Sequence, residues 1–121
     1  MMTKQQIIKW LDKYNIKNYH INDNLTVDVD DYVDLSFKEL TEIPFQFGKV
    51  KGGFNCSYNR LKLLKGCPEI VNGHFWCDNN KLTSLKGCPE EIKGYFFCDD
   101  YLKNSIEYKR WYIKYKLKKI L

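Results

Sequence analysis

The sequence predicts an α/β repeat protein, a short parallel β-solenoid of about four strands that is closed by an N-terminal helix and a basic C-terminal helix. Three observations support this prediction. Residues 53–73 and 74–94 are two copies of one 21-residue unit, the unit weakens on both sides of this pair, and helical patterns flank the array. A fixed period of this length is typical of stacked coils, because one coil cannot bury its own apolar face.

Each copy starts with a strand and continues into a turn. The pattern F-x-C-x-x-N-x-L-x-x-L begins at Phe54 and again at Phe75, and it fits the leucine-rich-repeat pattern with Phe and Cys at the inward strand positions. Asn59 and Asn80 are expected to satisfy backbone groups at the bend and to stack as a ladder. A Gly-Cys-Pro corner then follows on the opposite side of each coil.

The repeat weakens towards both ends, as terminal coils do. A weaker copy starts at Val33, with Lys38 at the asparagine position, and a last strand starts at Phe96, with Tyr101 at that position. We therefore expect four strands, of which two belong to full copies.

Residues 22–52 hold an acidic edge strand and the first coil. Residues 25–29 alternate like an edge strand, and residues 22–42 carry seven carboxylates against one lysine. A solvated acidic edge that discourages pairing with other chains is the simplest interpretation. Mimicry of nucleic-acid phosphate, which would make the chain an inhibitor of a nuclease or defence protein, is the alternative.

A helix is predicted on either side of the repeat core at residues 53–100. Residues 3–14 form the first, because Thr3 and Gln6 have capping-box spacing ahead of a helical apolar pattern. Residues 104–121 form the second, with Asn104 as N-cap and an apolar stripe facing the last coil. That stripe contains Leu102, Ile106, Ile113, Leu117, Ile120 and Leu121. Together, residues 1–121 are expected to form one domain.

The positive charge of the chain lies in its C-terminal segment. Seven basic residues against Glu107 give residues 101–121 a charge of +6, so the first hundred carry −1 of the total of +5. The segment is either a cap with a solvated face, a contact for phosphate backbones helped by Trp111, Tyr112 and Tyr115, or a contact for an acidic protein. The candidate contact residues of this basic tail are Lys109, Arg110, Lys114, Lys116, Lys118 and Lys119, and Lys103 is the seventh basic residue of the segment.

The five cysteines are all repeat positions, and we expect them to be buried free thiols. The sequence has no CxxC pair, so neither a zinc site nor any other metal or cofactor is expected. It shows neither a signal peptide nor an apolar run of transmembrane length, which predicts a cytoplasmic protein without a membrane partner.

The two copies share their framework but differ at the outward strand positions. In register, these positions should form a concave face whose later half exposes large aromatic side chains, as binding surfaces do. The candidate partner-binding residues are His74, Trp76, Asp78, Tyr95, Phe97, Asp99, Asn55 and Tyr32. The alternative is that the aromatic rings only stiffen the sheet or lie under the C-terminal helix.

Several stretches resemble a family of small leucine-rich-repeat-like proteins encoded by bacteriophages. The opening block of that family is similar to Ile16-Lys17-Asn18-Tyr19, residues 21–29 and residues 40–50, and its repeat is similar to residues 75–85. The resemblance implies a phage protein that acts in the host cytoplasm. It implies little about activity, because leucine-rich repeats serve many roles.

These observations lead to a functional expectation. The chain has no nucleophile with a base and no phosphate-cradling loop, so we expect no enzyme activity. The leading hypothesis is a protein-binding module directed at a host or defence protein, as a monomer or homodimer. The second hypothesis is a nucleic-acid-associated protein that uses the basic tail.

Overall fold

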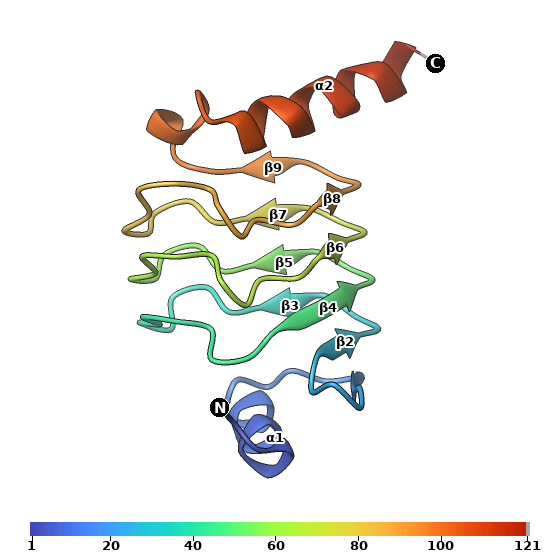
Figure 1. The fold of residues 1–121 in the computed structure, drawn as a ribbon, viewed down its shortest axis with the longest axis vertical. Coiled ribbons are helices and arrows are strands. Elements are labelled where there is room, and N and C mark those ends of the chain that lie inside the picture. The colour runs from blue at the N-terminus through green and yellow to red at the C-terminus, as the bar shows by residue number, and fades with distance from the viewer. Residues whose placement is uncertain (121) are drawn as a thin grey trace.

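The 21-residue unit folds as one coil that contributes a strand to each of two sheets. The computed structural model describes residues 1–120, and the coils stack along one axis with a helix at either end (Figure 1). The chain is thus a parallel β-solenoid, as the sequence predicted, and it has about three turns. Its elements are α1 (Lys4–Lys13), β1 (Tyr19–Ile21), β2 (Val27–Val29), β3 (Val33–Asp34), β4 (Phe47–Val50), β5 (Phe54–Asn55), β6 (Ile70–Val71), β7 (Phe75–Trp76), β8 (Glu91–Ile92), β9 (Phe96–Phe97), the 3-10 helix η1 (Asp100–Leu102) and α2 (Ile106–Ile120).

The four predicted strands form one parallel sheet in the order β3-β5-β7-β9. Phe54, Phe75 and Phe96 lie in register on three neighbouring strands, and all three side chains are buried. Their ring centroids are 6.0 and 5.5 Å apart, so each coil packs its phenylalanine on the next. Successive coils therefore bury a continuous core that no coil could form alone.

A second sheet, in the order β1-β2-β4-β6-β8, was not predicted. Two of its strands, β6 and β8, follow the Gly-Cys-Pro corners, where the sequence indicated only a turn and a return to the next coil. β6 and β8 are two residues long and bury one side chain each, Val71 and Ile92. Alternation over so few residues is too short to distinguish a strand from a loop.

The prediction that residues 25–29 form an edge strand is wrong. β2 lies inside the sheet, because it pairs with β4 on one side and with the antiparallel β1 on the other. The chain reverses between β1 and β2 through a turn. In this turn the backbone amide of Asn22 donates to the Thr26 carbonyl, and Leu25 adopts a positive φ of 68°. β1 is therefore the edge, and both valines of β2 are fully buried.

The predicted asparagine ladder is present. Asn59 Oδ1 accepts hydrogen bonds from the Lys38 and Leu40 amides of the preceding coil, and its Nδ2 donates to three carbonyl oxygens. Asn80 repeats the arrangement one coil later, with Oδ1 accepting from the Leu61 amide at 3.0 Å. Each asparagine therefore joins the bend of its own coil to the coil before it.

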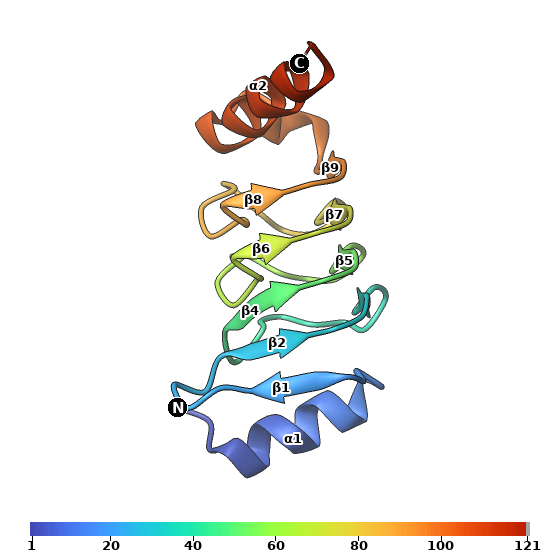
Figure 2. The same ribbon diagram turned by 90° about the vertical axis from the view of Figure 1, so that its right-hand side faces the viewer.

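The N-terminal helix covers the first coil, as predicted. Thr3 and Gln6 form the reciprocal capping box, which satisfies two of the free amides at the start of α1. Ile7 and Leu11 are buried against the core, and α1 runs alongside β1 at the lower end of the stack (Figure 2).

The C-terminal helix is present but turned about its axis relative to the prediction. Tyr108 and Trp111 pack on Phe96, with ring centroids 5.5 and 5.9 Å from it. Leu102 is buried as predicted, whereas the rest of the described stripe is exposed, and Leu121 lies outside the described residues. The aromatic rings bury more area per side chain than the aliphatic ones, which is the physical reason for the helix orientation. The exposed members are Ile106, Ile113, Leu117 and Ile120.

The start of α2 also differs from the prediction. Ser105, rather than Asn104, is the capping residue, because its Oγ accepts from the Tyr108 amide and its carbonyl accepts from the Lys109 amide. Within residues 1–120, neither helix combines the length and the apolar character needed to cross a bilayer.

Candidate functional site

Four aromatic side chains from two neighbouring coils gather on the outward face of the four-stranded sheet. His74 stacks on Tyr95 with ring centroids 5.1 Å apart, and Trp76 stacks on Phe97 at 5.4 Å. His74 also meets the edge of Trp76 at 5.4 Å, which joins the two stacks. We call His74, Trp76, Tyr95 and Phe97 the aromatic patch. The sequence predicted that these residues would lie together.

The outer coil leaves its two rings open to solvent. Tyr95 is 45% exposed and Phe97 is 41% exposed, whereas His74 and Trp76 are half-buried between the coils. Tyr95 also contacts Tyr115 of α2 at 5.4 Å between ring centroids. The rings therefore stack on each other and touch the helix, and they still present a surface.

A backbone contact fixes His74 within the patch. The Tyr95 amide donates to His74 Nδ1 at 2.8 Å, so this nitrogen carries no proton and Nε2 carries it. A Cβ on Gly94 would lie 2.4 Å from Nδ1, so only glycine allows this approach. Hydrogen bonding to Tyr115 raises the pKa of Tyr95 above the ordinary value of a phenol.

The other predicted site residues lie at the margins of the patch or apart from it. Asp78 and Asp99 hold Asn79, because Asp78 Oδ2 accepts from its side-chain amide and Asp99 Oδ1 accepts from its backbone amide, both at 2.9 Å. Asn55 Oδ1 accepts hydrogen bonds from the backbone amide and the hydroxyl of Ser57, so it is used within its own coil. Tyr32 is exposed, but the coil that separates it from His74 has Gly53 at the aligned position.

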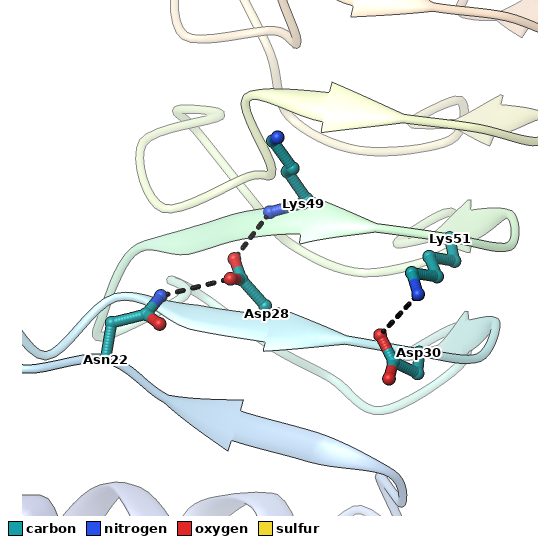
Figure 3. Close-up of polar contacts among 5 residues, drawn as sticks. All are labelled: Asn22, Asp28, Asp30, Lys49 and Lys51. Atoms are coloured by element: carbon teal, nitrogen blue, oxygen red, sulfur yellow. Dashed lines mark hydrogen bonds and ion pairs between the residues drawn. The ribbon is translucent and has the colours of Figure 1, made fainter.

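The carboxylates of the acidic segment also serve the fold. Asp28 Oδ1 accepts from the Lys49 amide at 2.8 Å and Oδ2 accepts from Asn22 Nδ2 at 3.2 Å, while Asp30 pairs with Lys51 at 3.4 Å (Figure 3). Asp28 therefore bridges neighbouring coils. These contacts favour the structural interpretation of the acidic segment over phosphate mimicry.

The basic tail is divided between two faces of α2. Arg110, Lys114 and Lys118 line a cleft between α2 and the last coil. Cys88 lies half-buried in this cleft, where desolvation, followed by the charge of Glu107, raises the pKa of its thiol to about 12. A thiol with this pKa is a poor nucleophile at pH 7. Lys109, Lys116 and Lys119 of the tail do not line the cleft.

Two side chains of the C-terminal segment replace backbone donors that a further coil would provide. The Arg60 and Lys81 amides donate to the carbonyls of Leu40 and Leu61, and the Tyr101 hydroxyl occupies the equivalent place at Leu82. Trp111 Nε1 likewise donates to the Gly94 carbonyl at 3.3 Å. Sequence reasoning missed both contacts. The helical spacing of Tyr108, Trp111 and Tyr115 was the available signal for a second apolar face.

Among residues 1–120, no cluster of three or more His, Cys, Asp or Glu side chains has the arrangement of a metal site. No family model, curated protein or solved structure matches the chain.

Proposed function

We propose that this chain is a non-enzymatic protein-binding module and that its partner docks on the aromatic patch. The observation that carries the proposal is the pair of stacks, His74 on Tyr95 and Trp76 on Phe97, on a face that remains partly open. Aromatic side chains dominate the energetics of protein interfaces, and they bury a large area for few rotatable bonds. Because neighbouring rings already hold each other, little further side-chain entropy is lost on binding.

The resemblance to phage-encoded repeat proteins suggests the class of partner. On that basis the proposed partner is a host or defence protein in the cytoplasm of an infected bacterium. The neutral imidazole, the phenol of Tyr95 and the carboxylates of Asp78 and Asp99 at the margin would favour a partner with an apolar centre and basic or hydrogen-bonding edges.

The nucleic-acid hypothesis has less support from the side-chain arrangement. Base stacking needs free aromatic faces, and Trp111 and Tyr115 stack on each other at 5.2 Å while half-buried against the last coil. Of Trp111, Tyr112 and Tyr115, only Tyr112 is exposed. This packing favours the protein-binding hypothesis.

The double variant Trp76→Ala/Phe97→Ala tests the proposed surface. Both side chains lie outside the core, so the fold should persist while the partner recovered by affinity purification from infected cells is lost. The measurement is quantitative mass spectrometry of the recovered proteins, with circular dichroism to verify the fold. We expect the affinity for the recovered partner to fall about tenfold or more, as removal of interface aromatics commonly causes.

A matched control removes another exposed aromatic pair. Phe37 and Tyr58 are not part of the aromatic patch, and they stack on each other with ring centroids 4.4 Å apart. Both residues adopt a positive φ, as does Asn79 one coil later. Phe37→Asn/Tyr58→Asn therefore introduces a residue that suits this backbone and should leave binding unchanged. If every recovered interaction survives Trp76→Ala/Phe97→Ala, the aromatic patch is not the binding surface.

A further inference from the structure

The helix α2 has two apolar faces, and the last coil covers only one of them. Tyr108, Trp111 and Tyr115 pack towards the solenoid. The opposite face carries an aliphatic stripe that points away from the stack. We call this set the outer stripe: Ile106 (65% exposed), Ile113 (58%), Leu117 (52%) and Ile120 (78%). Four large aliphatic side chains in one exposed line mark an interaction surface.

The outer stripe is narrow and has heptad spacing. Ile106, Ile113 and Ile120 are seven residues apart, and Leu117 follows Ile113 by four. At 3.6 residues per turn these side chains fall within about 60° of the helix circumference. A narrow line of this kind is typical of the seam between two helices, whereas a helix that lies in a membrane interface buries a broad apolar face.

Cations border the outer stripe on both sides. Helical geometry places Lys109 and Lys116 along one border and Arg110 and Lys114, which also line the cleft under α2, along the other, and all four side chains are exposed. None of these cations forms an ion pair with the described residues. A second copy of α2 would bring like charges together across the seam, which is unfavourable. The borders therefore favour a partner helix with acidic flanks.

We propose that the outer stripe packs against an amphipathic helix of a partner protein that carries aliphatic residues in its seam and Glu or Asp along its borders. Figures 1 and 2 show α2 lying across the end of the stack, so a second helix can reach its outer face without displacing a coil. The contact would extend over about 22 Å, the length of fifteen helical residues. A seam of this length gives a small interface of the transient class. The proposal does not depend on the aromatic patch.

The test uses the full-length protein and a fluorescent synthetic peptide as the probe. The peptide is an acidic heptad helix with Ile and Leu in its seam and Glu on both borders. Fluorescence anisotropy should show saturable binding that weakens with added salt, because the bordering charges are exposed. Ile113→Ser/Ile120→Ser should weaken binding about tenfold or more. Both side chains are exposed, so circular dichroism should show the helix retained.

Two controls distinguish the seam from general stickiness. Leu63 is 62% exposed in a different coil, and the repeat carries Ser84 at the aligned position, so Leu63→Ser should leave binding unchanged. The Lys109→Glu/Lys116→Glu variant should bind the acidic peptide more weakly than the wild type does. It should bind a version of the peptide with Lys in place of Glu more tightly than the wild type does. Trp76→Ala/Phe97→Ala should bind the acidic peptide like the wild type, so failure of the proposed function is distinguishable from failure of this proposal.

Four outcomes would overturn the proposal. The first is the absence of saturable binding to the acidic peptide. The second is a wild-type dimer in sedimentation analysis that becomes a monomer in Ile113→Ser/Ile120→Ser, because a second copy would then cover the stripe. The third is that the same side chains bind phosphatidylglycerol vesicles more tightly than they bind the peptide. The fourth is that they bind a single-stranded DNA oligonucleotide more tightly than the peptide.

Discussion

At the scale of single residues, the cysteines are apolar spacers of the repeat. Cys56, Cys77 and Cys98 lie one coil apart on the inward side of the four-stranded sheet, and all are buried free thiols. Cys67 is likewise buried, whereas Cys88 is half-buried at the cleft under α2. The prediction of buried free thiols is therefore confirmed for four residues, and the fifth is partly open because no further coil covers it.

Because of these thiols, the free energy of unfolding should depend on pH above about 8.5. Burial raises the pKa of Cys98 to about 11 and that of Cys88 to about 12. In the unfolded chain a thiol ionises near pH 8.5, so above that pH the unfolded state has released protons that the folded state retains. The free energy of unfolding should therefore decrease as pH rises from about 8.5 to about 11. Urea unfolding measured across this range gives the slope.

Two substitutions assign this slope to thiols. Cys98→Ala and Cys88→Ala should each reduce the pH dependence by up to one proton, while the titration of lysines and tyrosines remains common to all variants. A slope that is identical in the wild type and both variants would show that these thiols do not ionise differently on unfolding.

At the scale of elements, side-chain hydrogen bonds join each turn to its neighbour. Asn59 accepts two amides of the preceding coil and donates to three carbonyls, and its side chain is buried. Asn80 accepts one amide and is only half-buried. The Asn59 turn is thus tied to the coil before it by one more amide than the Asn80 turn, and it is better shielded from water.

The asparagine ladder predicts unequal losses of stability. Asn59→Ala leaves buried backbone groups unsatisfied, so we expect the free energy of unfolding to fall by about 2–4 kcal/mol. Asn80→Ala should cost less, because it accepts one amide fewer and water can reach it more easily. Urea unfolding of both variants at neutral pH provides the comparison. Equal losses would indicate that the buried amide contacts of the Lys38 turn contribute nothing.

The helix α2 shows how packing selects one of two possible faces. Its aliphatic stripe and its aromatic face lie on opposite sides, and either could have covered the last coil. The aromatic face also carries Trp111 Nε1, which reaches the Gly94 carbonyl, and no aliphatic side chain can replace that donor. The helix therefore turns its rings inward and leaves the outer stripe exposed.

At the scale of the whole molecule, stability depends on contact between neighbouring coils. Phe75 lies between Phe54 and Phe96, whereas Phe96 has a coil on one side and α2 on the other. The sheets run from the first coil to the last without a break, and the two helices cover their ends (Figures 1 and 2). A loss in the middle should therefore affect both halves of the stack.

Substitution of these phenylalanines tests this coupling. Phe75→Ala should lower the free energy of unfolding by about 3–5 kcal/mol, the usual cost of removing a buried ring, and accelerate amide hydrogen exchange in every coil. Phe96→Ala should accelerate exchange mainly in β8, β9 and α2. Hydrogen exchange followed by mass spectrometry resolves these regions. Uniform acceleration in both variants would mean that the stack unfolds only as one unit.

The sequence alone determined the solenoid and its four-stranded sheet, because a repeated sequence shows which residues become neighbours when the copies stack. Equivalent residues 21 positions apart must lie side by side in a stack, so Phe54 and Phe75, Asn59 and Asn80, and the aromatic patch followed from alignment of the chain with itself. The capping box at Thr3 followed from local spacing in the same way. In each case the decisive neighbours are either close in sequence or one period away.

Only the tertiary structure decided what happens where the period ends. β1 has no equivalent in the repeat, so its pairing with β2 and the burial of that strand left no periodic signal. The rotation of α2 depended on which face could bury rings and also replace the missing backbone donor at Gly94. In both places the outcome depends on which of several long-range contacts of similar apolar content is more stable. The pattern of residues along the chain does not show which of these contacts wins.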